Sequence, residues 1–567
     1  MAASSTLSLE GLRAAINADV FPTALAAAVL GAVFHQSIRK IEFDALMYHF
    51  MALSIAAFLG IACAYLSLGE LSPIGAIVKA SLAAVSFNTG LLISIGIYRL
   101  FFHRLRKFPG PFWAKLSRFY NASLAAKNVQ YFKEVEKMHD KYGDFVRTGP
   151  RELLIARKSA VPIIYGPNSE CRKSTWYGQT GNDPKKCSIH MTRDFKAHKL
   201  RRRAWDKGFS IKALSTYEPR IKAKADLFMS ALSARAGKPM DMSAWSMFFS
   251  FDVMGEVGFG KDFNNLTSGV EHPAIAAVHE HMTMLGVLSN VPWLLNLLGS
   301  IPGAAAGYSG FFNWCGSQIK DKQQSWDPEK YPQDIVSWLL KAFNEKDISS
   351  SPSEEALHDD SRVVIIAGSE TTATSLATIL WYFSKYPATF KKLQKLVDQA
   401  MPGGIAAWSY DKAKSITYID DIINESLRLK PALLTGGYRV TPAKGIKIDE
   451  VYIPGDTNVF VPMQLIQTHP RYYKQAKEFI PERFGERREE MGTDEAPFLP
   501  FSLGAYSCPG KNLALLSLRI TISHIALLYD VGFAPGETGE KFDKDVLDTF
   551  TTTLAPLNLV FTPRARN

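Results

Sequence analysis

The stretch Phe501-Ser-Leu-Gly-Ala-Tyr-Ser-Cys508-Pro-Gly510 decides how this chain is interpreted. It places one cysteine between glycines in a loop, directly before an apolar helical segment over residues 512–529. Glycine lets a flat ligand approach the backbone closely, and the start of a helix favours negative charge on the cysteine sulfur. The pattern predicts a thiolate that holds a haem iron, with oxygen activation as its chemistry. The alternative is a buried structural cysteine, which is a common role for an unpaired cysteine.

The composition excludes several other classes of protein. The chain has 567 residues, a net charge of +11 and five cysteines. Its basic residues are dispersed and form no block with aromatic residues, so we expect no nucleic-acid partner and favour a membrane surface or an acidic protein. The cysteines have no paired spacing, which predicts neither disulfides nor a zinc site. No linker rich in Gly, Ser or Pro follows Phe108, so we expect one large domain there.

Three apolar stretches, Val20–Phe34, Met47–Leu68 and Ile74–Tyr98, precede this domain. The second and third reach the about 20 residues that a membrane span needs, whereas the first is marginal. Basic residues follow the first and third stretches but not the second, so the positive-inside rule predicts a catalytic domain facing the cytosol at the endoplasmic reticulum membrane. With three spans the N-terminus is lumenal; with two it is cytosolic and the first stretch lies in the interface. We expect an anchor over 1–107 and a catalytic domain over 108–567.

Helical periodicity dominates the chain after the anchor, for example over Leu124–Tyr142, Thr192–Phe209 and Tyr217–Ala236. Strand-like pieces such as Phe145–Thr148 and Thr457–Val461 are short and few. The pattern predicts a mainly α domain with small β-sheets and argues against a doubly wound α/β fold, which needs regular alternation of strands and helices.

A long helix is predicted over Asp359–Tyr386, capped by one of its first three residues. Its centre, Ala367-Gly-Ser-Glu370-Thr371-Thr, combines a glycine with threonines that weaken a helical ladder, so we expect a local opening that holds water or O₂. Glu370 and Thr371 then supply a carboxylate and a hydroxyl for delivering protons. The alternative is that these hydroxyls only satisfy their own backbone.

Two further groups of charged residues carry weaker signals. Glu425 and Arg428 are three residues apart on a predicted helix and can form an ion pair, and Arg483 follows in a Pro-Glu-Arg-Phe segment. His198 and Arg202 are four residues apart on a basic amphipathic helix and can bind two anionic oxygens. A solvated basic face is the alternative for the second pair.

The cysteine loop resembles the haem-binding signature of the cytochrome P450 superfamily, Phe-x-x-Gly-x-Arg-x-Cys-x-Gly, with Phe501, Gly504, Cys508 and Gly510 in place. Tyr506 departs from it, because the family usually has a cation there that pairs with a haem propionate. A phenol donates one hydrogen bond but brings no charge. The other motifs match family helices in the right order, and the resemblance covers about residues 108–563.

This resemblance implies a cytochrome P450 fold behind an N-terminal transmembrane region, with haem b ligated through iron by Cys508. Glu425, Arg428 and Arg483 are then a buried charge network that fixes the cysteine loop, a structural role. Glu370 and Thr371 guide protons. The residues implied to hold haem are Cys508, His198, Arg202, Arg439, Phe501, Gly504, Gly510 and Tyr506, with Arg439 compensating for the charge that Tyr506 lacks.

The implied function is a membrane-anchored monooxygenase that inserts one oxygen atom from O₂ into an apolar small molecule. No Gly-x-Gly-x-x-Gly follows a strand and no Walker loop is present, so we expect the chain to bind no NADPH or flavin itself and to receive electrons from another protein. The resemblance implies that this electron donor is NADPH–cytochrome P450 reductase. We expect the substrate to face residues 431–437 and 550–554, under a roof formed by residues 171–189. The anchor and the Tyr506 loop resemble fungal secondary-metabolism enzymes, which suggests a terpenoid, indole or polyketide substrate. Candidates for docking the electron donor are Arg201, Arg203, Lys207 and Lys511.

Two alternatives stay open. An isomerase or dehydratase of the same fold rearranges its substrate without external electrons, but such enzymes often lack the Glu370 and Thr371 pair that this chain keeps. A non-catalytic haem-binding membrane protein is the second alternative, and Tyr506 is the feature in its favour.

Overall fold

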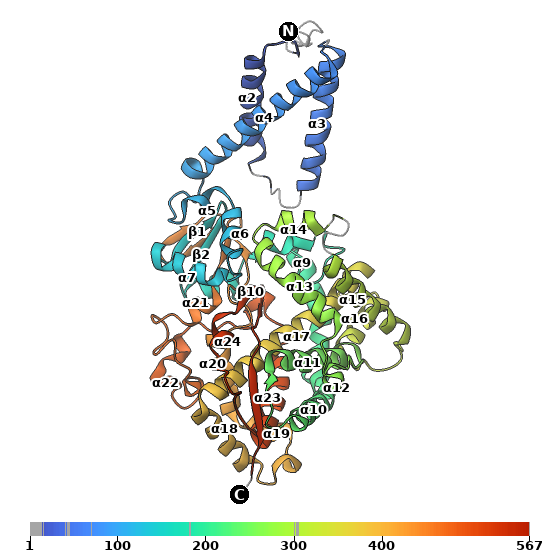
Figure 1. Cartoon of the computed structure of the whole chain (residues 1–567), viewed down its shortest axis with the longest axis vertical. Coiled ribbons are helices and arrows are strands. Elements are labelled where there is room, and N and C mark those ends of the chain that lie inside the picture. Colours follow the sequence, from blue (N-terminus) through green and yellow to red (C-terminus); the bar gives the residue numbers. More distant parts are fainter. Residues whose placement is uncertain are drawn as a thin grey trace. The chain divides into compact units, whose positions relative to one another are not determined.

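The structure is a computed structural model that describes residues 14, 16–39, 41, 46–69, 71–180, 183–299, 301 and 306–565. The chain divides into two compact units, Met1–Arg118 and Phe119–Asn567 (Figure 1). The predicted functional division, an anchor over 1–107 and a catalytic domain over 108–567, stays a prediction.

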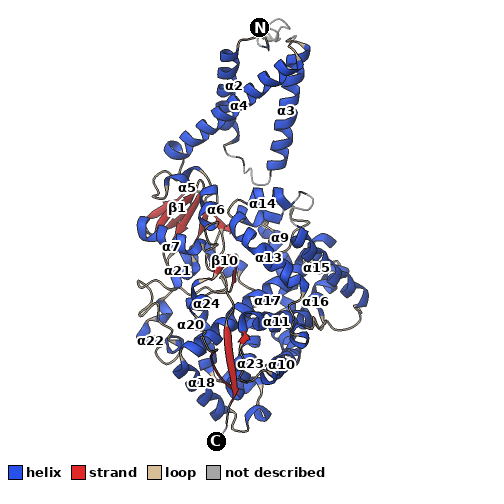
Figure 2. Cartoon of the chain, in the orientation of Figure 1, coloured by secondary structure: helices blue, strands red, loops and turns tan. Residues whose placement is uncertain are grey.

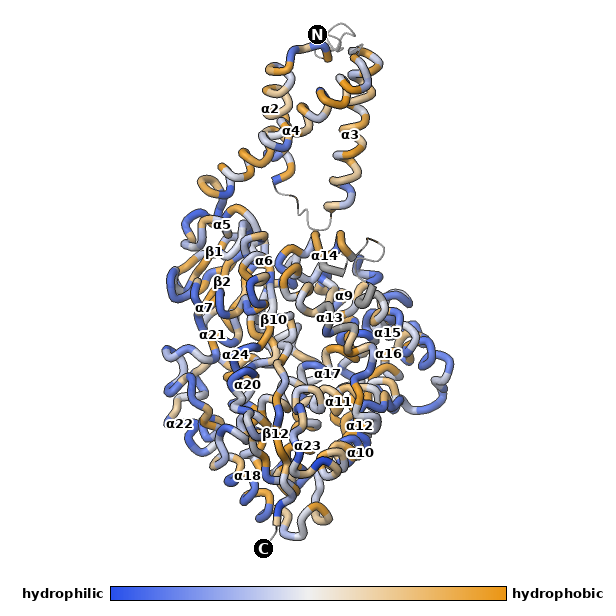
Figure 3. Tube along the Cα trace, in the orientation of Figure 1, coloured by the Kyte–Doolittle hydropathy of each residue, from blue (hydrophilic) through white to orange (hydrophobic). Residues whose placement is uncertain are grey.

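The smaller unit consists mainly of three long apolar helices, α2 (Val20–Ile38), α3 (Met47–Ser67) and α4 (Pro73–Ile97). All three are long and apolar enough to cross a membrane, and Figure 3 shows that most of their residues are hydrophobic. A π-helical turn (Tyr98–Phe102) and the short helix α5 (Phe112–Leu116) follow α4. Such exposure of apolar side chains is the property of helices whose surroundings are lipid.

Helices α2 and α4 pack side by side in the same direction. Near their starts, the Lys79 ammonium donates to the Ala18 carbonyl at 2.7 Å. Near their ends, Nδ1 of His35 lies 2.8 Å from Oγ of Ser94. Between these contacts a Cβ on Gly90 would lie 2.0 Å from a carbonyl oxygen of α2, so only glycine permits this approach. The two helices therefore run parallel along nearly the whole length of α2.

The larger unit is mainly helical with small sheets, as predicted (Figure 2). Its centre is α17 (Glu354–Lys385), which packs against α11 (Met242–Met254), α20 (Thr417–Leu429) and α23 (Lys511–Leu528). α17 and α23 are also apolar enough to cross a membrane, but most of each lies buried inside the unit, so they are core helices. The further helices are α6 (Phe119–Ala125), α7 (Tyr131–Tyr142), α8 (Ala160–Tyr165), α9 (Phe195–Gly208), α10 (Ile211–Ala234), α12 (Asn265–Ser268), α13 (Pro273–Leu288), α14 (Pro292–Gly299), α15 (Ala306–Ser325), α16 (Ile335–Asn344), α18 (Pro387–Ala400), α19 (Tyr410–Ser415), α21 (Met463–Gln467), α22 (Arg488–Met491) and α24 (Glu540–Lys544).

The strands form one five-stranded sheet and smaller ones. The larger sheet has the order β1-β2-β8-β5-β3, and its antiparallel β3–β5 pair places Lys173 opposite Arg439. A three-stranded sheet has the order β4-β12-β9, and β6–β7 and β10–β11 are separate pairs. The strands are β1 (Phe145–Gly149), β2 (Glu152–Ile155), β3 (Arg172–Lys173), β4 (Met240–Asp241), β5 (Arg439–Val440), β6 (Ile446–Ile448), β7 (Val451–Ile453), β8 (Asn458–Phe460), β9 (Tyr529–Phe533), β10 (Leu547–Thr549), β11 (Thr551–Thr553) and β12 (Asn558–Pro563).

Three sequence-based boundaries are wrong, one of them because α10 begins at Ile211, where Ser210 caps it, and not at the predicted Tyr217. The predicted helix over 124–142 is interrupted between α6 and α7, where Oδ1 of Asn128 accepts the Gln130 N–H and Val129 adopts a φ of 54°. Such local side-chain bonding competes with the helical ladder. The start of α17 was predicted too late, because the hydroxyl of Ser353 accepts the Ala356 N–H and caps the helix there.

Candidate functional site

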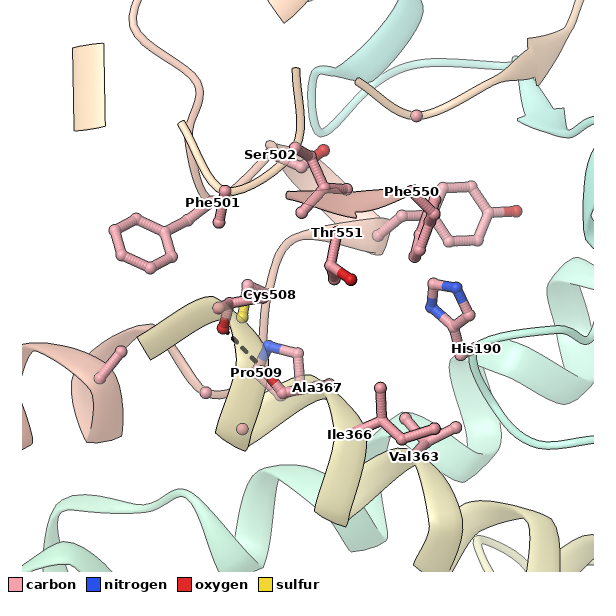
Figure 4. A pocket seen from close by; sticks show the side chains of 18 of the residues that line it. His190, Val363, Ile366, Ala367, Phe501, Ser502, Cys508, Pro509, Phe550 and Thr551 are labelled. Carbon is pink, nitrogen blue, oxygen red and sulfur yellow. Dashed lines mark hydrogen bonds between the residues drawn. The ribbon is translucent and has the colours of Figure 1, made fainter. Parts of the chain in front are cut away.

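A central cavity of about 800 Å³ lies inside the larger unit, between α17, the cysteine loop and the β10–β11 hairpin. Figure 4 shows Cys508 and His190 on opposite sides of it, with Val363, Ile366 and Phe550 along its walls. Both predicted substrate-facing segments reach this cavity, and so does the predicted roof. The lining residues from these segments are Ala432, Leu433, Gly436, Gly437, Phe550, Thr551, Lys173, Trp176, Tyr177 and Ile189.

Cys508 reaches the cavity from a tightly folded loop. Its backbone N–H donates to the Phe501 carbonyl at 2.8 Å. Gly504, within this loop, has a φ of +61°. A Cβ there would lie 2.5 Å from the Gly166 carbonyl oxygen, so glycine is required. Burial raises the pKa of the Cys508 thiol, while the backbone N–H of Gly510 and nearby cations oppose that rise. The thiol therefore faces the cavity beside groups that favour its anion.

The predicted charge network is present as a compact cluster, which we call the ion triad: Glu425, Arg428 and Arg483. All three side chains are fully buried. Arg428 donates to both carboxylate oxygens of Glu425 at 2.7 and 2.8 Å, and Nε of Arg483 lies 3.3 Å from the same carboxylate. Each arginine also donates to backbone carbonyls. The triad thus satisfies its own charges within the chain.

The ion triad is connected to the segment that leads into the cysteine loop. Arg428 donates to the backbone carbonyl of Gln467 at 2.9 Å, and the Gln467 side-chain oxygen accepts the Leu499 N–H at 2.8 Å. Leu499 lies two residues before Phe501. Two hydrogen bonds therefore connect the triad to a residue two positions before the loop begins.

The centre of α17 lines the cavity without the expected local opening. The helix is continuous, and the hydroxyl of Thr371 donates to the Ala367 carbonyl at 2.8 Å. Gly368 serves close packing, because a Cβ there would lie 2.3 Å from the sulfur of Met254 on α11. The alternative reading of this segment, hydroxyls that satisfy their own backbone, therefore describes the geometry in this structure.

Glu370 is buried behind the cavity wall instead of lining it. The hydroxyl of Thr551, which does line the cavity, donates to its carboxylate. Burial raises the pKa of Glu370, and the Thr551 hydrogen bond opposes the rise. A carboxyl group with a raised pKa is suited to donating a proton, and Thr551 is the contact through which it reaches the cavity. Thr551 was predicted only as a substrate-facing residue.

His198 and Arg202 both line the cavity, as their predicted shared face requires. Nδ1 of His198 is buried without a hydrogen-bond partner, and burial with nearby cations lowers its pKa to about 2. Arg202 donates to the Ser507 carbonyl at 2.6 Å and forms an ion pair with Asp206. This helix face therefore borders the cavity and is not a solvated basic surface.

Tyr506 occupies a cluster of cations that the sequence only partly revealed. The Arg439 guanidinium lies 4.8 Å from the centre of its ring, and the Lys173 ammonium lies 5.1 Å from it. We call Lys173 and Arg439 the cation pair. Nε of Arg439 and the hydroxyl of Tyr506 are both buried without a partner. No sequence pattern singles out Lys173, because a two-residue strand has no detectable periodicity.

His190 is a second cavity residue that sequence reasoning missed. Its ring points into the cavity in Figure 4, and it packs edge-on against Phe550 with ring centres 5.6 Å apart. Burial and the positive charges of Lys173 and Arg362 lower its pKa to about 3, so it is neutral. Phe550 adopts a φ of 82°, a strained conformation of the kind that clusters at functional sites.

One predicted member of the electron-donor docking surface is wrong. Arg201 is buried and forms an ion pair with Asp360 at 2.6 Å, so it offers no charge to a partner. Arg203, Lys207 and Lys511 are exposed.

A mainly helical fold around a deep apolar cavity, with a cysteine thiol in its wall, is the arrangement expected of haem-thiolate proteins. The comparisons agree. The cytochrome P450 family model matches residues 109–560. A cytochrome P450 monooxygenase, orf5, from Eupenicillium brefeldianum is 39% identical over 84% of this chain and 94% of its own length. Tryprostatin B 6-hydroxylase from Aspergillus fumigatus is 32% identical over 85% of each chain.

The chain belongs to the cytochrome P450 family. Cytochrome P450 monooxygenase FCK2 from Fusarium pseudograminearum is 38% identical over 84% of this chain and 85% of its own, and such relatives make this chain a monooxygenase. A crystal structure of the cytochrome P450 CYP102L1 has the same fold, with a TM-score of 0.65 at 20% identity over 76% of this chain and 98% of that one. The family implies a cysteine-ligated haem iron.

The residues around the cavity fit such a group. Several residues that line it have a buried polar atom without a hydrogen-bond partner in the described protein, among them Nε of Arg439, the Tyr506 hydroxyl, Nδ1 of His198 and Nε1 of Trp205. A Cβ on Gly437 would lie 3.0 Å from the Arg439 guanidinium, so a side chain there would crowd this corner. Donors of this kind match the carboxylates of haem, and the thiol matches its iron.

Proposed function

We propose that this protein inserts one oxygen atom from O₂ into an apolar small molecule, using haem b ligated by Cys508 and electrons from NADPH–cytochrome P450 reductase. Bound haem would supply the activation of O₂. The observation that carries the proposal is the placement of Cys508 and Thr371 in the walls of one apolar cavity. The acid and hydroxyl are both retained, which argues against the isomerase and the non-catalytic alternatives.

Protons reach the cavity through two hydroxyls in this proposal. Glu370 is the buried acid, and the Thr551 hydroxyl that it contacts opens onto the cavity. Thr371 holds its own proton on the Ala367 carbonyl and can turn it toward the cavity by rotating χ1. The two hydroxyls thus deliver protons from two adjoining elements, α17 and the β10–β11 hairpin.

The cavity walls suggest the class of substrate. Apolar side chains dominate, and a neutral His190 and a few threonine hydroxyls supply hydrogen bonds. This matches a mid-sized apolar molecule with few polar groups, and a terpenoid, indole or polyketide intermediate of fungal secondary metabolism fits it.

The anchor is proposed to span the endoplasmic reticulum membrane three times, with a lumenal N-terminus. The parallel packing of α2 against α4 supports this, because a helix that lies in the interface is not expected to follow a spanning helix along its length. The Arg39 guanidinium lies 5.7 Å from the centre of the Tyr98 ring, so the basic ends of both helices meet at one side. By the positive-inside rule that side is cytosolic.

The topology is tested with an Asn-x-Thr acceptor added at the N-terminus. Three spans place it in the lumen, where it becomes glycosylated; an acceptor added after Asn567 stays unmodified and is the control. An unmodified N-terminal acceptor would mean two spans.

The activity is tested by co-expressing the full chain with the reductase and screening indole, terpenoid and polyketide compounds for NADPH-dependent gain of one oxygen atom. With an accepted compound, Thr371→Ala should lower product formed per NADPH by about tenfold, since general acid and relay groups contribute this much or more. Thr378→Ala, on the same helix but away from the cavity, is the matched control. Equal coupling in both variants would overturn the role of Thr371.

A further inference from the structure

We propose that the positive charge missing at Tyr506 has moved to Lys173, which binds a haem propionate together with Arg439. This inference rests on the proposed haem site. It assigns to Lys173, a residue of the β3 strand, the task that a cation in the cysteine loop usually performs.

The strand pairing makes Lys173 and Arg439 one unit. They are opposite each other in the β3–β5 ladder, and both line the cavity. The ring of Tyr506 lies within 5.1 Å of both charged groups, two residues before Cys508 in the same loop. Both cations are therefore held beside the Tyr506 ring of the cysteine loop.

No ion pair within the described protein neutralises these two charges, although the more distant Asp360 carboxylate favours the charged form of Lys173. Both side chains are buried, and neither forms an ion pair with any Asp or Glu in the described ranges. The tyrosines around them give cation–π contacts, which are weaker than the cost of burying a charge. Burial and the charge of Arg439 push the pKa of Lys173 well below its usual range. An anion bound beside Lys173 and Arg439 would offset the free-energy cost of burying their two charges.

The unused donors at the corner match carboxylate oxygens. The Lys173 ammonium donates to the Ile189 and His190 carbonyls at 2.8 and 2.6 Å, which leaves one of its three protons. Nε of Arg439 and the Tyr506 hydroxyl have no partner. One ammonium, one guanidinium and one phenol can thus bind a propionate without an arginine at position 506.

Lys173 also connects the haem side to the roof of the cavity. The same ammonium holds the carbonyls of Ile189 and His190, and the His190 ring points into the cavity. A purely structural role in holding this roof is the competing explanation.

The test compares Lys173→Met with the double variant Lys173→Met/Tyr506→Arg in substrate-free full-length protein. Haem loss to excess apomyoglobin and the haem reduction potential are the readouts. Lys173→Met should keep the red-shifted CO Soret band of a thiolate-bound haem but lose haem about tenfold faster, with a lower potential because a cation near the haem favours reduction. The double variant should recover to within about threefold of the native rate, because it restores the charge. Lys224→Met is the control, since Lys224 is buried but paired with Asp262 and outside the cavity.

Native haem retention in Lys173→Met would overturn the proposal. Faster loss without recovery in the double variant would also overturn it, because a lysine that only holds the roof cannot be replaced by an arginine at position 506. If Lys173→Met yields no folded protein, the double variant alone decides: recovery of folded haem protein supports the proposal and its absence contradicts it. A native protein without the red-shifted band would instead overturn the proposed haem site.

Discussion

The ion triad and the cation pair both contain buried cations, but only the triad contains a carboxylate that pairs with them. In the triad, two arginines share the Glu425 carboxylate and several carbonyls, and all three side chains are fully buried. The cation pair is also buried but has no carboxylate partner in the described chain. A buried charge costs several kcal/mol unless it is paired. The triad is therefore complete before any cofactor binds, whereas the pair depends on an anion from outside the chain.

The largest expected effect comes from breaking the complete cluster. Glu425→Gln leaves two buried arginines without a counter-charge, which should destabilise the fold by about 3–5 kcal/mol. Urea unfolding of the detergent-solubilised protein measures this, in both the haem-bound and the haem-free form. Equal midpoints for the variant and the native protein would show that the triad does not need its carboxylate.

Breaking the incomplete cluster should have the opposite effect on the haem-free protein. Arg439→Met removes a buried cation without a carboxylate partner, so the haem-free protein should unfold at the same free energy or be stabilised by about 1–2 kcal/mol. The haem-bound form should lose stability in the same variant. If Arg439→Met destabilised the haem-free protein as strongly as Glu425→Gln does, the proposed difference between the two clusters would be wrong.

The cation pair also shapes the pH dependence of stability through His190. Burial, together with the positive charges of Lys173 and Arg362, lowers the pKa of His190 to about 3, although Asp359 opposes this shift. Below pH 6.5 the His190 imidazole binds a proton in the unfolded chain but stays neutral in the folded protein. The free energy of unfolding therefore falls as the pH drops, by about 1.4 kcal/mol per pH unit for one such histidine. His190→Phe should remove this contribution between pH 6 and pH 5. Unfolding free energies with identical pH slopes would contradict the shifted pKa.

The smallest effect is expected at an exposed pair. Lys444 and Glu170 lie 2.7 Å apart but are both largely exposed. Glu170→Gln should change the unfolding free energy by at most about 0.5 kcal/mol, with or without haem, because water screens such pairs. A larger change in the unfolding free energy would mean that burial does not determine how much an ion pair stabilises this protein.

The ion triad and several residues that line the cavity could be predicted from the sequence. The Glu-x-x-Arg and Pro-Glu-Arg-Phe segments identify all three members of the triad, because residues three apart share a helix face. Cys508, Thr371, His198 and Arg202, which belong to the motifs identified in the sequence, all line one cavity. These positions are readable since each belongs to a motif with fixed spacing.

The remaining residues depend on contacts between distant segments. Lys173 meets Arg439 through a two-residue ladder that joins strands far apart in the chain, and Thr551 meets Glu370 across the cavity wall. The cap of α17 was misplaced because Ser353 caps the helix before the acidic residues begin, while Asp359 and Asp360 hold the backbone N–H groups of Ser188 and Ile189. Local sequence preferences do not show which distant segment a side chain will contact.

The central claim is that Cys508 ligates a haem iron as its thiolate. The direct measurement is the visible spectrum of the reduced, membrane-bound protein exposed to carbon monoxide, compared with Cys508→Ser. The account predicts a strongly red-shifted Soret band in the native protein that disappears in the variant. Well-folded native protein without that band, or a variant that keeps it, would contradict the account.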